Sequence, residues 1–246
     1  MPDPGASKEN HTRSGSGPAP AGRLSRRRMM AASAAVAGVG LATVPAQAEA
    51  AAGGQAVSLG VSGTTTVEFR GRVTQTGSSG QSFTSYGYLI RASNTVQSDL
   101  FAGTSLSEST ALLTAYATGN LMARVTDVSV ASSVHSLDIV GTMTVYQRSQ
   151  PGASFSDPSS FQVGVPVARY DMTLQDVLTV FATNTGLPTL SGDMRQTAAG
   201  RLSGPLAGQR FGRKGARLRF FATGLGFKTD PAPNANLEIA GNWSIE

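Results

Sequence analysis

The chain has 246 residues, of which 40% are hydrophobic and 14% charged, with two histidines, no cysteine and a formal net charge of +5. The lack of cysteine excludes disulfides, thiolate catalysis and cysteine-ligated metal centres, and the single histidine beyond residue 48 excludes a histidine-rich metal site, although an all-oxygen calcium site stays open. Residues 1–48 hold six of the 20 basic and two of the 15 acidic side chains, so the remaining chain is nearly neutral, whereas a nucleic-acid-binding domain carries its own basic patch.

The first element expected along the chain is an export signal. Residues 1–22 are rich in Pro, Gly, Ser and Ala and show no apolar periodicity, so they cannot form a core. Residues 25–30 then read Ser-Arg-Arg-Arg-Met-Met, in which Arg26 and Arg27 form a pair ahead of two apolar residues. This arrangement resembles a twin-arginine signal, with methionine at the sites where Phe and Leu are more usual. The resemblance implies that a twin-arginine translocase exports the folded protein from a bacterial cytoplasm.

The segment that follows is expected to be cleaved after export. Residues 31–44 are apolar but dominated by Ala and Gly, and they are fewer than the roughly 20 strongly apolar residues of a membrane-spanning helix. Ala46 and Ala48 flank a small-x-small cleavage site, and a second candidate lies two residues further on. We therefore expect no transmembrane anchor in the mature chain. An ordinary secretory signal with a chance run of arginines is the alternative.

These features divide the chain into three parts. Residues 1–48 are the expected signal, residues 49–62 a flexible linker rich in Gly and Ala, and residues 63–246 a single domain. Arginine outnumbers lysine 17 to 3, which suits a GC-rich genome, and we expect an actinobacterium. The mature protein is expected to be secreted to the medium, with retention at the cell wall or in a periplasm as alternatives.

Beyond residue 63, short runs rich in Val, Thr, Ile, Phe and Tyr alternate with clusters of Gly, Pro, Ser, Asn and Asp. This pattern predicts an all-β domain of about 8–10 antiparallel strands, closed as a barrel or packed as a sandwich, with at most one short helix. The expected strands lie at residues 65–73, 86–90, 121–130, 136–148, 161–172, 190–202, 216–223 and 236–246.

Three of these runs alternate clearly between apolar and polar residues, so each should present one face to the core. A proline at 166 marks an edge or a bulge in another run. The expected inward residues are Val67, Phe69 and Val73 in the first run, Leu137, Ile139, Met143 and Val145 in the fourth, and Leu237, Ile239, Trp243 and Ile245 in the last.

Two segments leave helix and strand open. Residues 174–181 fit a helical stripe, yet Met172, Leu174, Leu178 and Val180 also fit a strand. Residues 105–117 begin with a possible capping box but end in a β-type run.

The strand count and alternation loosely resemble those of allene oxide cyclase-like, dirigent and lipocalin β-barrels. The likeness covers the layout of the strands and carries no functional residue onto this chain.

The candidate ligand-binding residues are one histidine and three large aromatic residues. His135 is in phase with Leu137, so its ring should point to the interior, as a general base, as a ligand donor or as a plain core histidine. Tyr88, Tyr116 and Trp243 could line a cavity inside a barrel or belong to its core.

Catalytic motifs are absent from the mature sequence. It contains neither Gly-x-Ser-x-Gly nor Ser-x-x-Lys, and Asp138 is out of phase with His135, so Ser133, His135 and Asp138 cannot converge as a triad. Most of the carboxylates that could serve glycoside hydrolysis should be solvated, and Asp127 is the expected exception because it falls in phase with an apolar run. Those carboxylates are Glu68, Glu108, Asp127, Asp138, Asp176 and Glu238.

Basic side chains gather around the glycine-rich stretch at residues 204–215. This stretch is not a phosphate-binding loop, because no Gly-Lys-Ser or Gly-Lys-Thr closes it. It could contact a wall polymer, an anionic headgroup or an acidic ligand, or it could be a charged hairpin tip. The basic residues are Arg210, Arg213, Lys214, Arg217 and Arg219.

The sequence thus favours a secreted, cofactor-free β-protein that binds a small apolar ligand or an envelope component. The alternatives are a cofactor-free isomerase, cyclase or hydrolase that acts in the same cavity, and a structural envelope module without a ligand. We expect no cofactor and no bound metal. The expected partners are the translocase and a small ligand or wall polymer, and not nucleic acid.

Overall fold

The computed structural model describes residues 66–128, 133–229 and 234–245. The expected export signal with its arginine pair, the cleavage site and the linker lie outside these residues. The described part confirms the all-β prediction and decides between its two forms, because the strands close into an antiparallel barrel. No helix in these ranges is long and apolar enough to cross a bilayer.

Eight strands form the barrel wall, and each pairs with its neighbours in an up-and-down order that returns from β9 to β1. The short strand β6 pairs with the ends of β5 and β8 and lengthens the wall at one end. The strands are β1 (Thr66–Thr76), β2 (Ser82–Ala92), β3 (Leu113–Val128), β4 (Ser133–Gln147), β5 (Val165–Ala182), β6 (Thr185–Leu187), β7 (Thr189–Ala199), β8 (Arg217–Lys228) and β9 (Ala235–Ile245).

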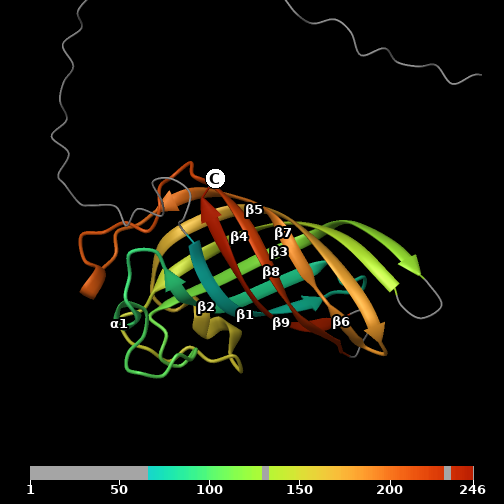
Figure 1. Cartoon of the computed structure of the whole chain (residues 1–246), viewed down its shortest axis with the longest axis horizontal. Coiled ribbons are helices and arrows are strands. Elements are labelled where there is room, and N and C mark those ends of the chain that lie inside the picture. Colours follow the sequence, from blue (N-terminus) through green and yellow to red (C-terminus); the bar gives the residue numbers. More distant parts are fainter. Residues whose placement is uncertain (1–65, 129–132, 230–233, 246) are drawn as a thin grey trace, which may run out of the picture. The chain divides into compact units, whose positions relative to one another are not determined.

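The two ends of the barrel differ. In an up-and-down barrel, alternate connections lie at the same end, so the long segments 93–112, 148–164 and 200–216 share one end, which we call the base. They contain the helix α1 (Gln97–Leu100) and the 3-10 helices η1 (Pro158–Gln162) and η2 (Gly204–Leu206). Short turns and β6 lie at the opposite end, which we call the mouth. Figure 1 shows α1 at the left and β6 at the right of the barrel.

The 200–216 segment is held at the base by two buried glutamines. The Gln147 side chain donates to the Ser203 carbonyl at 3.0 Å and accepts from the Ser203 amide at 2.8 Å. The Gln196 side chain donates to the Phe211 carbonyl at 2.7 Å and accepts from the Arg213 amide at 3.0 Å. The basic stretch therefore lies in the long connection of the β7–β8 hairpin, with Arg210, Arg213 and Lys214 exposed, as its hairpin-tip form predicts.

Gly212 lets this segment pass close to Gln196. Its φ is +72°, a conformation that residues with a side chain rarely adopt, and a Cβ at this position would lie 2.1 Å from Gln196 Oε1. Leu202, Leu206 and Phe211 from the same segment are buried in the main core. Glycine at 212 thus allows the segment to bring its apolar side chains down onto the base.

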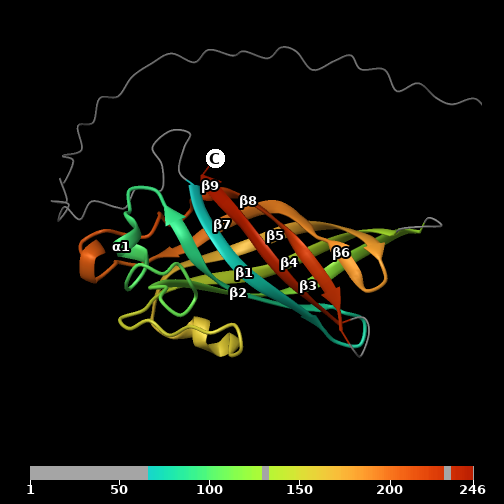
Figure 2. The same ribbon diagram turned by 60° about the horizontal axis from the view of Figure 1, so that its bottom comes forward.

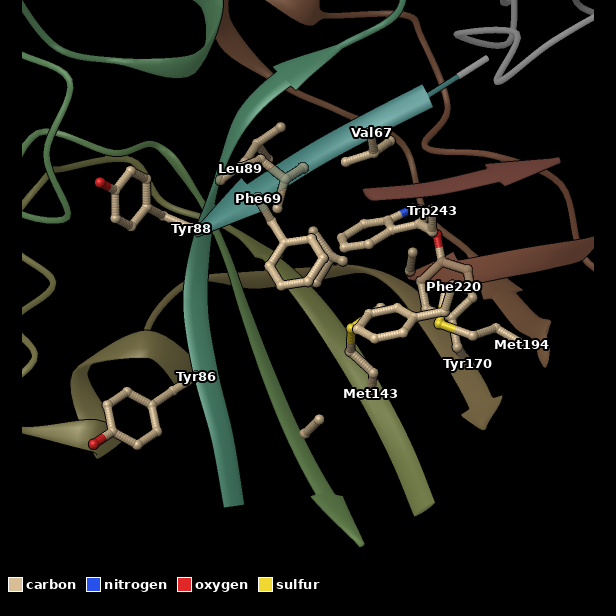
Figure 3. Close-up of a cluster of buried hydrophobic side chains, with 14 of the residues drawn as sticks. Val67, Phe69, Tyr86, Tyr88, Leu89, Met143, Tyr170, Met194, Phe220 and Trp243 are labelled. Carbon is tan, nitrogen blue, oxygen red and sulfur yellow. The ribbon is translucent and has the colours of Figure 1, made fainter. Parts of the chain in front are cut away.

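Aromatic rings fill the base half of the barrel interior. The Phe69 ring lies 5.4 Å from that of Phe220 and 5.3 Å from that of Trp243, between ring centroids, and Tyr170 lies 6.4 Å from Trp243. Figure 3 shows this cluster. The expected inward faces of the first, fourth and last runs are confirmed, because every member is buried except Ile245, which is partly buried against the core.

A second aromatic cluster lies outside the wall. Tyr86 and Tyr88 on β2 point away from the Phe69 cluster (Figure 3) and pack on rings from the base connections. The Tyr86 ring lies 5.4 Å from Phe161, and the Tyr88 ring lies 6.1 Å from Phe101. Figure 2 shows the η1 segment against this side of the barrel. Both faces of β2 are therefore covered, although only one faces the interior.

The ambiguous segments are resolved in favour of strands. Residues 174–181 belong to β5, so the strand reading is correct there. The possible capping box at Ser105 and Glu108 starts no helix, because this stretch forms turns and the helix lies earlier, at α1. Pro166 sits at a bulge opposite the Val145–Tyr146 step of β4, as expected.

Candidate functional site

A cavity of about 350 Å³ occupies the mouth of the barrel. Small-molecule sites in proteins measure about 300–1,000 Å³, so this space suits a small ligand. Its apolar wall includes Phe83, Leu137, Leu178, Val180 and Leu237.

A second, smaller cavity of about 70 Å³ lies deeper in the barrel, and its lining is almost wholly apolar. Phe83 lines both cavities, so they are neighbours along the lumen. Met143 and Trp243 belong to the deeper cavity, where the aromatic cluster of the base half begins. The lumen thus consists of the larger cavity at the mouth and a narrow apolar cavity beyond it.

Four titratable side chains line the mouth cavity in the described part of the chain: Arg124 from β3, His135 from β4, Asp176 from β5 and Lys228 from β8. In the closed order of eight wall strands, β3 and β8 are four strands apart, so the two cations come from opposite sides of the mouth. The imidazole and the carboxyl lie on the wall beside Arg124. Charged and apolar side chains therefore share the wall of this cavity.

His135 lies on the inner face of β4, as the sequence predicts. Its Nδ1 is 3.0 Å from Thr126 Oγ1 and its Nε2 is 3.0 Å from Ser133 Oγ, so both ring nitrogens have hydroxyl partners. Burial, assisted by the positive charge of Arg124, holds the pKa of His135 below its usual value of 6.5. The ring is fixed in orientation and is neutral at neutral pH.

Asp176 is the buried carboxyl of the site, with 2% of its surface exposed. It accepts a hydrogen bond from the Thr189 amide at 3.0 Å. Burial raises the pKa of Asp176 to about 6, and the Thr189 amide opposes this rise only in part. The carboxyl therefore changes its charge in mildly acidic solution.

Sequence reasoning grouped Asp176 with the solvated carboxylates. The available signal was its phase, because Leu174 and Leu178 flank it at inward positions in the strand reading of this segment. A carboxylate between two inward leucines is an unusual core residue. The helical alternative for residues 174–181 hid this pattern.

The expectation for Asp127 is wrong. A bulge between Leu121 and Ala123 shifts the phase of β3, so the residues after it change faces. Arg124 and Thr126 then face the mouth, while Asp127 is exposed on the outer side. The same bulge explains why the sequence did not indicate Arg124 as a site residue.

The structure brings only two of the four expected ligand-binding residues, Tyr116 and Trp243, to one cavity. His135 lines the mouth, and Trp243 lines the deeper cavity. Tyr88 packs in the outer cluster. Tyr116, which pairs with Tyr86 between Ala115 and Ala117, is partly buried and lines the deeper cavity together with Trp243. The mouth cavity contains none of the three aromatic residues.

The site has few of the parts that catalysis would need. Ser133 contacts His135, as a nucleophile contacts its base, but Nδ1 of the ring is partnered by the Thr126 hydroxyl rather than by a carboxylate. Asp138, the third member of the sequence triplet, is exposed on the outer face. In the described residues, no three side chains of His, Asp or Glu are grouped so that they could hold a metal ion.

Comparison with known proteins does not assign this chain: no family model, no curated protein and no solved structure matches it. The geometry of the mouth is therefore the basis for a functional proposal.

Proposed function

We propose that the barrel is a binding protein for a small, mainly apolar molecule with one polar end. The apolar part lies against the leucines of the mouth and extends toward the deeper cavity, and the polar end stays at the charged side chains of the mouth. The observation that carries this proposal is the 350 Å³ mouth cavity, whose wall combines apolar side chains with four titratable ones.

The two alternatives receive less support. A purely structural module has no need of a cavity of this size. A hydrolase of the Ser–His type would need a carboxylate on the second ring nitrogen, whereas Nδ1 of His135 contacts the Thr126 hydroxyl. Binding requires only the volume and the polar side chains.

The same proposal places the protein outside the cytoplasm, exported by the twin-arginine translocase. Its support is the sequence of the signal, with Arg26 and Arg27 ahead of a weakly apolar stretch. An exported carrier would meet its ligand in the medium or at the cell envelope.

The test is calorimetric titration of the purified protein with decanol and naphthol, two neutral probes. Leu178→Trp fills the mouth from inside, whereas Val177→Trp adds the same ring at a neighbouring, 37% exposed position on the outer face. We expect the wild type and Val177→Trp to bind, and Leu178→Trp to bind at least about tenfold more weakly.

Thermal unfolding of both variants shows whether each is folded. If Leu178→Trp does not fold, Leu237→Trp takes its place, because it fills the same cavity from another strand. Failure of the wild type to bind either probe would contradict the proposal. Equal binding by the wild type and a folded mouth-blocked variant would place the site elsewhere.

A further inference from the structure

The charges of the mouth are arranged in rows along the wall. Arg124 pairs with Leu137, which in turn pairs with Asp176, so these residues form one row across β3, β4 and β5. Thr126, His135 and Leu178 form the next row, closer to the mouth opening. Asp176 therefore lies deeper than His135, at the level of Arg124.

The cations of the mouth have no acidic partner in the described part of the chain. The ion pairs there join Arg72 to Glu238, Arg91 to Glu68 and Arg219 to Asp193, all on the outer surface. Lys228 pairs in register with Ala235, another residue of the mouth lining, so its stem starts on the inner face. Two cations thus face one small cavity from opposite walls.

We propose that the ligand is a monoanionic amphiphile, an aliphatic chain ending in a carboxylate or a sulfate-like group, whose head lies between Arg124 and Lys228. This inference rests on the proposed function and names its ligand class. The chain follows the apolar wall formed by Leu137, Leu178 and Leu237. Arginine and lysine supply charge-assisted hydrogen bonds to such a head.

The same arrangement couples binding to pH. Asp176 lies in the same row as Arg124, beside the position of the head, where its negative charge repels an anion and its protonated form donates a hydrogen bond. The raised pKa of Asp176 puts this change near pH 6, and His135 gains positive charge below its own lowered pKa. Both changes favour the anion as the solution becomes more acidic.

Within the described residues, the other elements around Asp176 contribute cationic or neutral groups to the lining and no second carboxylate. β3 contributes Arg124 to the lining, β4 His135 and β8 Lys228, and the lining residues of β1, β2, β6 and β9 are uncharged. β7 contributes the Thr189 amide, which bonds the carboxylate. The protein should therefore load in mildly acidic surroundings and release its ligand in neutral ones.

The test compares probes of one chain length by calorimetry: decyl sulfate, decanoate and decanol, each below its micelle concentration. Decyl sulfate keeps its charge across the range, so any pH dependence of its binding belongs to the protein. At about pH 5.5, we expect decyl sulfate to bind roughly tenfold more tightly than decanol, because a charged head adds hydrogen bonds that a hydroxyl lacks. Similar binding of decanoate would show that the charge, rather than the shape of the head, is recognised.

The variants separate the mouth from the rest of the surface. Arg124→Gln and Lys228→Gln should each weaken decyl sulfate binding by roughly tenfold and leave decanol binding unchanged. Arg195→Gln makes the same charge change at an exposed residue of β7 and should have no effect. Decyl sulfate should bind about fivefold more weakly at about pH 7.5 than at about pH 5.5. This difference should shrink in Asp176→Asn and vanish when His135→Gln is added.

The outcomes distinguish this inference from the proposed function. If decanol binds as tightly as decyl sulfate, the anionic head is wrong while the binding function stands. If decyl sulfate is preferred but shows no pH dependence, the role of Asp176 is wrong. If no probe binds, the proposed function itself fails.

Discussion

His135 on β4 and Asp176 on β5 are diagonal neighbours on the inner face of the barrel, because His135 pairs with Leu178 while Asp176 pairs with Leu137. Burial lowers the pKa of the imidazole and raises that of the carboxyl, so the two values move toward each other. One wall of the mouth therefore carries two adjacent groups that both gain a proton below neutral pH.

The first prediction concerns stability and pH. A carboxyl whose pKa rises from 3.8 to about 6 on folding stabilises the protein below about pH 4, and this stabilisation is lost as the pH rises through 6. The ionised Asp176 then costs up to about 3 kcal/mol of unfolding free energy. Asp176→Asn keeps an acceptor for the Thr189 amide, so it should be more stable than the wild type at neutral pH and equal to it near pH 4.

Urea unfolding at several pH values measures this difference. The contribution of His135 to stability has the opposite pH dependence. Because folding lowers its pKa, the protein loses this contribution as the pH falls below about 6.5. That contribution is present in both proteins and cancels in the comparison. Parallel pH profiles for the wild type and Asp176→Asn would show that Asp176 does not have a raised pKa.

The second prediction concerns Trp243, the single tryptophan of the chain, which is 1% exposed. Its emission should be blue-shifted in the folded protein and move to the red on unfolding, because the indole leaves an apolar environment. Trp243→Ala removes a ring that packs on Phe69 and Tyr170, and it should lower the unfolding free energy by about 3–5 kcal/mol.

Phe221→Ala is the matched control, since Phe221 is a 46% exposed ring on the outer face of the neighbouring strand β8. It should change the unfolding free energy by much less. Emission typical of water-exposed indole in the folded protein would contradict the buried cluster.

The third prediction concerns export. Changing both Arg26 and Arg27 to Lys should leave the precursor in the cytoplasm, because the twin-arginine route requires the arginine pair. A reporter fused to residues 1–60 measures the exported fraction, and Arg23→Lys, outside the pair, serves as the control. Undiminished export of the double variant would indicate the general secretory route instead.

Local alternation was sufficient to predict most strands and their inward faces. It could not decide between barrel and sandwich, because closure depends on the pairing of β1 with β9, which joins the two ends of the domain. It did not show which face of β2 points inward, because Tyr86 and Tyr88 are buried on the outer face by rings of the base connections. Alternation indicates which residues share a face, and it does not show which face points inward when both are covered.

The residues of the mouth were predicted only where the strand kept a regular alternation. His135 was placed correctly because β4 keeps one phase from Leu137 to Val145. Arg124 was missed because a bulge in β3 leaves no mark in the sequence, and Asp176 was missed because its segment also fits a helix. The charged side chains at the mouth come from separate strands, so only the register of these strands brings the charges together.

The base connection held by Gln147 and Gln196 packs Leu202, Leu206 and Phe211 into the core, whereas the larger cavity lies at the mouth. A second molecule cannot displace a ligand in the lumen from the base side, because both must pass through the mouth. Replacement of one molecule by another therefore passes through an empty barrel. For the ligand that we propose, the rate of exchange is then set by its own first-order dissociation, and raising the concentration of a competitor does not increase that rate.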